Sequence, residues 1–196
     1  MTRTSRFSAL IVTATVALAS PVFAYPAGTS LEVSATAQIV TANTFSINVS
    51  NIAPGERCTV LFNKKKTSCT TTGGATNKSL TLNTPSTKGR FKIIATVPTD
   101  GEDGRSDSSV IYVASYRAPA AAKVGRTAAF SASFLPEGTE VALFVNSVYS
   151  GSEYADENGK ASGSELEWVP SVKGNRSIVM KADGYVIFSK TYKVAK

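Results

Sequence analysis

The stretch Ala-Pro-Gly-Glu-Arg-Cys-Thr-Val-Leu-Phe-Asn (residues 53–63) returns in altered form 83 residues later. The matching pairs at this spacing are Gly55 with Gly138, Val60 with Leu143, Phe62 with Val145, and Asn63 with Asn146. Residues 85–94 similarly recur, at a spacing of 85, as residues 170–179. A repeat of this kind usually records a duplicated structural unit. We therefore predict two copies of one small fold, with the boundary near Ala114.

Hydrophobic and polar residues alternate through both copies. This period of two is the pattern of strands that bury one face. It is clearest at 31–36, 45–50, 58–62, 91–97, 130–134 and 141–145, and turn residues separate these runs. The aromatic residues Phe45, Phe62, Phe91, Phe130 and Phe134 mostly fall on positions that we expect to point inward. Because no convincing amphipathic helix follows residue 24, the sequence predicts an all-β chain of two tandem β-sandwiches.

The N-terminal residues are typical of a secretory signal. Residues 1–6 carry two positive charges and no acid, residues 7–19 are apolar, and small residues close the segment at 22–24. We predict that residues 1–24 form a signal peptide that is removed on export. The apolar run is too short to cross about 30 Å of hydrocarbon. The mature chain is therefore expected to be secreted, to have no membrane span and to be a monomer.

Cys58 and Cys69 are the only cysteines of the chain. They flank a predicted hairpin with its tip at Asn63, and if Val60 pairs with Thr67, Cys58 lies opposite Cys69. An even number of cysteines in an oxidising compartment normally means a disulfide, which we predict here. A redox pair or half of a metal site is the alternative. The absence of a Cys-x-x-Cys spacing and of any His disfavours both.

Several motifs resemble those of tandem bacterial immunoglobulin-like (Ig-like) domains of exported surface proteins. They are the Pro-x-Gly turn before the central strand, the Asp-x-Asn-Gly-x-Ala run at 156–161, and the segment 85–93 with its Gly-x-Phe-x-Ile entry. The resemblance implies Ig-like sandwiches at residues 25–114 and 115–196. It further implies a non-enzymatic binding or spacer module, with an adhesive role at a bacterial surface. The partner would be a protein or polymer of the cell envelope.

A different binding function stays open. A short hairpin disulfide followed by the Gly-rich loop 70–74 also resembles the neocarzinostatin-type chromoproteins, which implies a small-molecule carrier. Catalysis is not expected, because a chain without His cannot form the common triads or His-ligated zinc sites. The pair Glu165 and Glu167 equally fits a solvated strand. We predict no cofactor and no metal site, although the acidic segment from Asp100 to Asp107 is a candidate calcium loop.

The charge of the chain points to anionic partners. Lys and Arg number 21 against 14 Asp and Glu, a formal net charge of +7. Positive charge on an exported protein favours association with anionic polymers or head groups. The one compact basic run is Lys64, Lys65 and Lys66 at the hairpin tip, which we predict as a contact with an anionic surface. No nucleic-acid motif is present, and no nucleic-acid partner is expected.

Overall fold

The computed structural model describes residues 30–98 and 104–196, and in these ranges it consists of strands, turns and loops without a helix. The predicted signal peptide at residues 1–24 lies outside the described residues. So does the first half of the candidate calcium loop, residues 100–103, whereas its residues 104–107 are described. No helix in the described part of the chain is long and apolar enough to cross a membrane.

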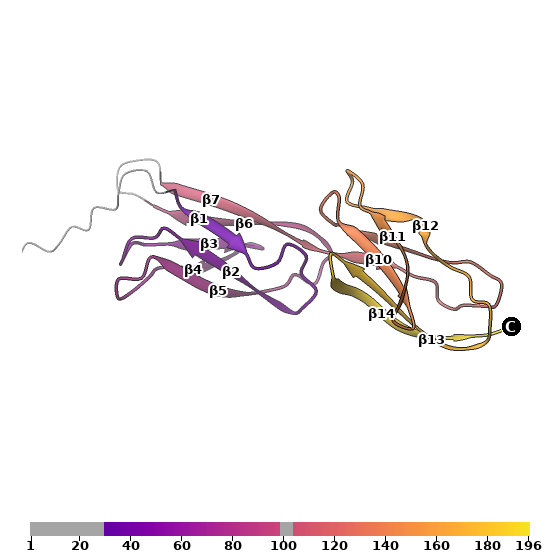
Figure 1. Ribbon diagram of the computed structural model, residues 1–196. Helices are drawn as coiled ribbons and strands as arrows, with labels where there is room; N and C mark the ends of the chain where they lie inside the picture. Colours follow the sequence, from indigo (N-terminus) through magenta and orange to yellow (C-terminus); the bar gives the residue numbers. More distant parts are fainter. Residues whose placement is uncertain (1–29, 99–103) are drawn as a thin grey trace, which may run out of the picture.

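The first seven strands form one sandwich, drawn in indigo to magenta in Figure 1. They are β1 (Glu32–Ala35), β2 (Thr44–Ser50), β3 (Thr59–Phe62), β4 (Lys65–Ser68), β5 (Asn77–Asn83), β6 (Gly89–Val97) and β7 (Arg105–Val113). Strands β1, β2 and β5 make a three-stranded sheet in the order β1-β2-β5. The other four make a second sheet in the order β4-β3-β6-β7.

The last seven strands repeat this arrangement. They are β8 (Ser115–Arg117), β9 (Ala128–Ser133), β10 (Glu140–Val145), β11 (Val148–Tyr154), β12 (Ala161–Trp168), β13 (Gly174–Ala182) and β14 (Tyr185–Val194). The three-stranded sheet runs β12-β9-β8 and the four-stranded sheet β11-β10-β13-β14. In both sandwiches the pairings between these strands are antiparallel and the fifth strand returns to the sheet of the first two, as in Ig-like sandwiches. The predicted all-β fold of two sandwiches is confirmed; the domain limits at residues 114 and 115 stay a prediction.

Each sandwich encloses a separate apolar core. In the first, Ile47, Val60, Ile93 and Ile111 are completely buried between the two sheets. In the second, the completely buried residues include Leu143, Leu166, Ile178 and Met180. Complete burial of one such side chain contributes about 1.5–3 kcal/mol, so these inward rows supply most of the driving force for folding.

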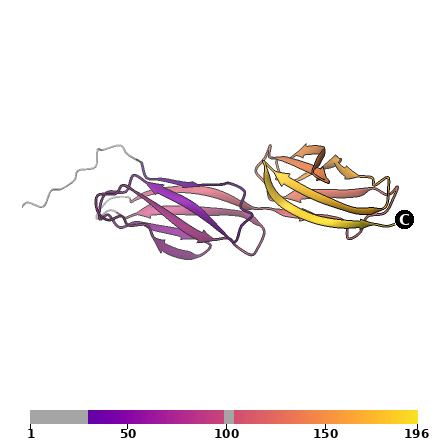
Figure 2. The same ribbon diagram turned by 60° about the horizontal axis from the view of Figure 1, so that its bottom comes forward.

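The two sandwiches lie end to end, as Figures 1 and 2 show from two directions. The connection is short, because β7 ends at Val113 and β8 begins at Ser115. The single residue between them, Ala114, is buried. It packs with Ile39 of the first sandwich into the core cluster of the second. A joint of one buried residue leaves little freedom for the two sandwiches to move independently.

Two matching hairpin turns reflect the duplication. Asn63 and Lys64 have φ of 46° and 63°, and Asn146 and Ser147 have φ of 50° and 67°. Two successive residues with positive φ form a tight two-residue turn whose twist matches that of the two strands it joins. Phe134 departs from expectation, because it follows β9 with φ of 59° and is 47% exposed. The prediction that its ring points into the core is wrong, since the chain turns there and the strand alternation ends.

Candidate functional site

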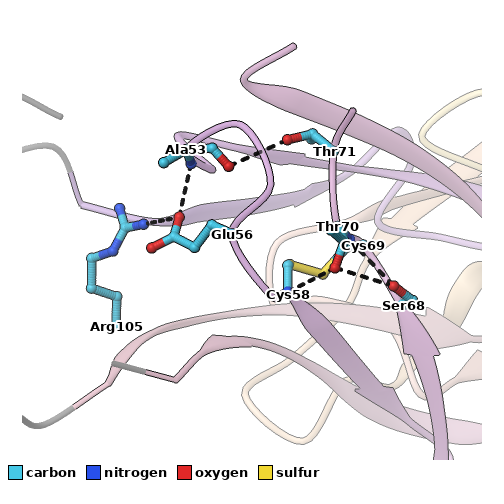
Figure 3. The surroundings of a disulfide bond; sticks show 8 residues. All are labelled: Ala53, Glu56, Cys58, Ser68, Cys69, Thr70, Thr71 and Arg105. Carbon is cyan, nitrogen blue, oxygen red and sulfur yellow. Dashed lines mark hydrogen bonds and ion pairs between the residues drawn. A yellow bond between two sulfur atoms is a disulfide. The ribbon is translucent and has the colours of Figure 1, made fainter. Parts of the chain in front are cut away.

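The hairpin of β3 and β4 has the register that the sequence predicts. Val60 lies opposite Thr67, and the Cys69 N–H donates to the Cys58 carbonyl at 2.9 Å. The structure joins Cys58 and Cys69 by a disulfide, with the Cα atoms 4.8 Å apart (Figure 3). Both residues are buried in the first core, at 2% and 0% exposure. The sulfurs are therefore part of the packing and are not presented to solvent.

An ion pair supports the turn that leads into this hairpin. Glu56 accepts hydrogen bonds from the Ala53 N–H at 2.8 Å and from the Arg105 guanidinium (Figure 3). Arg105 also donates to the Asn51 carbonyl at 2.9 Å. Both charged side chains are largely buried, with 26% of the Arg105 side chain and 21% of the Glu56 side chain exposed. The pair ties residues 51–56 to the start of β7, which is a structural role.

The predicted contact residues Lys64, Lys65 and Lys66 are all exposed but do not share one face. Lys65 is paired with the buried Phe62, and Lys66 with the exposed Leu61. Since successive strand residues point to opposite sides, Lys65 and Lys66 diverge. Lys65 lines a hollow beside β5, and Lys64 occupies the turn itself. The lysine run therefore divides between two sides of the hairpin.

Lys66 instead shares a surface with two cations of β6. Leu61 lies between Lys66 of β4 and Ile94 of β6, and Arg90 and Lys92 point the same way as Ile94. We call the outward side of the sheet β4-β3-β6-β7 the cationic face. It consists of Thr59, Leu61, Lys66, Ser68, Arg90, Lys92, Ile94, Thr96, Ser106, Ser108, Val110 and Tyr112. None of these residues is acidic; Asp107 of β7 points to the other side, where it accepts a hydrogen bond from the Val33 N–H at 2.7 Å.

The cationic face contains a shallow hollow between β6 and β7. Arg90 and Lys92 line it on one side, and Ser108 and Val110 on the other. Toward the second sandwich, Arg90 also borders a separate hollow, together with Tyr112 and the carboxylates of Glu137 and Glu157. Arg90 therefore lies between an acid-free sheet face and an acidic joint. Sequence reasoning missed Arg90 and Lys92 because they alternate with Gly89 and Phe91 and so form no continuous basic run.

The corresponding outward face of the second sandwich is aromatic. Tyr149 and Tyr154 of β11 are 56% and 66% exposed, and the Phe144 and Tyr149 rings meet edge to face at 5.9 Å. The Lys181 Nζ lies 5.0 Å from the Phe144 ring centre. The register of β10 against β11 shifts between Leu143 and Phe144, which places Tyr149 opposite Phe144 on the outward side. A bulge of this kind leaves no clear signal in the sequence.

The other candidate residues have structural surroundings. The rings of Phe45, Phe62 and Phe91 contact one another in the first core, at 5.3 and 6.3 Å. A carrier would need such rings open to a ligand. Glu165 and Glu167 are exposed strand residues, and the Glu165 N–H donates to the Glu153 carboxylate at 3.3 Å. Within residues 30–98 and 104–196, no group of three His, Cys, Asp or Glu could hold a metal ion.

No known family model and no curated protein matches this sequence. Among solved structures, the chain is similar to invasin, a bacterial integrin-binding protein, with 13% identity, 85% of this chain and 39% of that chain covered, and a TM-score of 0.33. It is also similar to a Ca2+-stabilized adhesin that helps an Antarctic bacterium bind ice, with 14% identity, 85% of this chain and 49% of that chain covered, and a TM-score of 0.30. A third similar structure is the human OSCAR ligand-binding domain, with 11% identity, 84% of this chain and 98% of that chain covered, and a TM-score of 0.39. The chain spans less than half the length of the two bacterial structures, and its own strand order, not these likenesses, identifies its fold.

Proposed function

We propose that the protein is an exported, non-enzymatic binding module that contacts an anionic polymer of a cell surface. In this proposal residues 1–24 direct export, and residues 25–114 and 115–196 are two Ig-like domains held as a stiff spacer. The carrier function is the weaker candidate, because the rings of the first core contact each other instead of lining an open site.

The observation that supports this function is the cationic face. Lys66, Arg90 and Lys92 are exposed on one side of a single sheet that carries no carboxylate on that side. A positive surface without carboxylates on its own sheet face attracts a polyanion, and salt weakens the attraction because the screening length falls from about 10 Å at 0.1 M to about 3 Å at 1 M. Lys64 adds charge at the adjoining turn. The predicted lysine contact thus extends across the sheet instead of remaining at the hairpin tip.

The test is retention of residues 25–196 on immobilised dextran sulfate, with uncharged dextran as the reference polymer. We expect retention in 0.1 M NaCl and release by 1 M NaCl. The triple variant Lys66→Gln, Arg90→Gln, Lys92→Gln should weaken binding by about 3- to 140-fold, since exposed ion pairs each contribute roughly 0.2–1 kcal/mol.

The matched control removes the same net charge from the second sandwich. Lys160→Gln, Lys173→Gln, Lys193→Gln replaces three exposed lysines that lie outside the cationic face. This control should bind nearly as the unmodified protein does. Equal losses in the two triple variants would mean that net charge alone drives association, and the cationic face would then have no special role.

A further inference from the structure

The hollow on the cationic face has the composition of a site for an acidic sugar. Arg90 is paired with Tyr112 and Lys92 with Val110, so that the two cations project over the β6–β7 pair. Residues two apart on a strand are about 6.7 Å apart along it, which lets both long side chains reach one bound group. Ser108 and Val110 form the opposite wall, with one hydroxyl and one apolar side chain.

We propose that this hollow binds the carboxylates of an acidic polysaccharide, which names the partner class of the proposed anionic-polymer function and rests on it. Arg90 supplies a planar guanidinium, which matches a carboxylate with two parallel hydrogen bonds. Lys92 supplies a second positive charge, and the Ser108 hydroxyl can exchange hydrogen bonds with a sugar hydroxyl. The charge of the face is complementary to this ligand, because its three cations face no carboxylate on the same sheet surface.

The apolar residues of the face favour a sugar polymer over other polyanions. Leu61 of β3, Ile94 of β6 and Val110 of β7 lie on the same face as the cations, and Leu61 is 37% exposed. A pyranose ring has an apolar face that can pack against these side chains, while a carboxylate of the sugar reaches Arg90. A polyphosphate chain would use the charges alone. A membrane surface binds through buried apolar area as well as charge, and Leu61 is the one large apolar side chain of this face that is exposed.

Two carboxylates close to Arg90 allow a separate test of where the ligand binds. Glu137 and Glu157 border the second hollow that Arg90 lines. Their negative charges oppose an incoming carboxylate, because like charges at short range repel. Replacing both by Gln should therefore strengthen binding of an acidic polysaccharide at low salt, by an amount that disappears in 1 M NaCl. Unchanged or weaker binding would place the ligand away from Arg90.

The decisive experiment measures binding of residues 25–196 to polygalacturonate by titration calorimetry at 0.1 M NaCl. Arg90→Lys keeps the charge and removes the planar fork, and we expect at least a threefold loss of affinity. Arg117→Lys, at an exposed position on β8 in the second sandwich, is the matched control and should bind as the unmodified protein does. Fully methyl-esterified polygalacturonate should not bind. Circular dichroism and the unfolding midpoint confirm that each variant is folded.

The possible failures are distinguishable. If the unmodified protein binds none of polygalacturonate, dextran sulfate or polyphosphate, the proposed function fails together with this inference. If Arg90→Lys binds polygalacturonate normally while the triple Gln variant does not, the function stands and the hollow is not the site. If polyphosphate or phosphatidylglycerol vesicles bind at least as tightly per charge as polygalacturonate, the assignment to a sugar polymer is overturned.

Discussion

Removal of the disulfide should destabilise the first sandwich and spare the second. Cys58 and Cys69 are separated by 11 residues, and on the chain-entropy description closing a loop of this length stabilises the folded state by about 2.8 kcal/mol. Because 1 kcal/mol corresponds to roughly 4–8 °C for a domain of this size, the double variant Cys58→Ala, Cys69→Ala should lower the first unfolding midpoint by about 10–20 °C. That is a large share of the few kcal/mol that stabilise a small domain.

The assay separates the sandwiches by their signals. Trp168 is the only Trp in the chain and lies on β12, so that its fluorescence reports the second sandwich. Far-UV circular dichroism reports both. We expect the double variant to split the dichroism transition and to leave the Trp168 midpoint nearly unchanged. The matched control is Val141→Ala, at the position in the second copy that corresponds to Cys58, which should instead lower the Trp168 midpoint.

Two results would refute the reasoning. Exported protein that reacts with two equivalents of a thiol reagent before reduction has no disulfide, and the stability assigned to loop closure would then be absent. If the unmodified protein has the disulfide and the double variant lowers the unfolding midpoint equally in both signals, the two sandwiches unfold as one cooperative unit. The buried joint at Ala114 would then couple them more strongly than their separate cores suggest.

Three further predictions concern the joint, the ion pair and alkaline pH. Small-angle scattering should show a stiff elongated particle, and insertion of Gly-Gly-Ser after Ala114 should broaden its shape distribution; an equally broad distribution without the insertion would contradict the stiff joint. Glu56→Ala should lower the free energy of unfolding of the first sandwich by roughly 1–3 kcal/mol, because it removes two hydrogen bonds to a charged acceptor; no change in urea titrations would show that water replaces them. Burial, and secondarily Tyr116, raises the pKa of Tyr192 above its ordinary value, so the unfolded chain loses this proton first. The stability that Tyr192 contributes should therefore be complete below about pH 10 and fall as the pH rises further. In Tyr192→Phe the free energy of unfolding should fall less steeply with alkaline pH, and it should be lower at neutral pH because the 2.7 Å hydrogen bond to the Pro119 carbonyl is lost. An unchanged slope would show that Tyr192 is not the source of the pH dependence.

The elements that sequence reasoning predicted well are those that depend on local pattern. Alternation with a period of two identified the inward rows, because a strand that buries one face must repeat in this way. With the hairpin tip placed at Asn63, the supposed pairing of Val60 with Thr67 put Cys58 opposite Cys69, and the structure has this pairing. The repetition of Asn63 as Asn146 matched the two turns because both need positive φ, which Asn tolerates better than most residues.

The cationic face could not be predicted in this way. Lys66 and Lys92 are far apart in the chain and lie on one surface only because β3 pairs with both β4 and β6. That pairing is non-local and has no signature in the spacing of the lysines. The compact run of three lysines gave the stronger sequence signal, although strand alternation sends two of them to opposite sides. Proximity in sequence was therefore a poor guide to proximity on the sheet.

The two copies share an inner face and differ on the outer one. Val60 and Ile93 correspond to Leu143 and Ile178, and all four are completely buried. On the outward side, the register places Tyr149 where the first copy has Lys66, and a spacing of 85 places Ser177 where it has Lys92. Core truncations typically cost 2–5 kcal/mol, whereas exposed substitutions usually change stability by less than about 0.5 kcal/mol, so the outer positions were free to diverge. Because fold does not determine function, the shared framework leaves the cationic and the aromatic face to be judged separately, each by its own side chains.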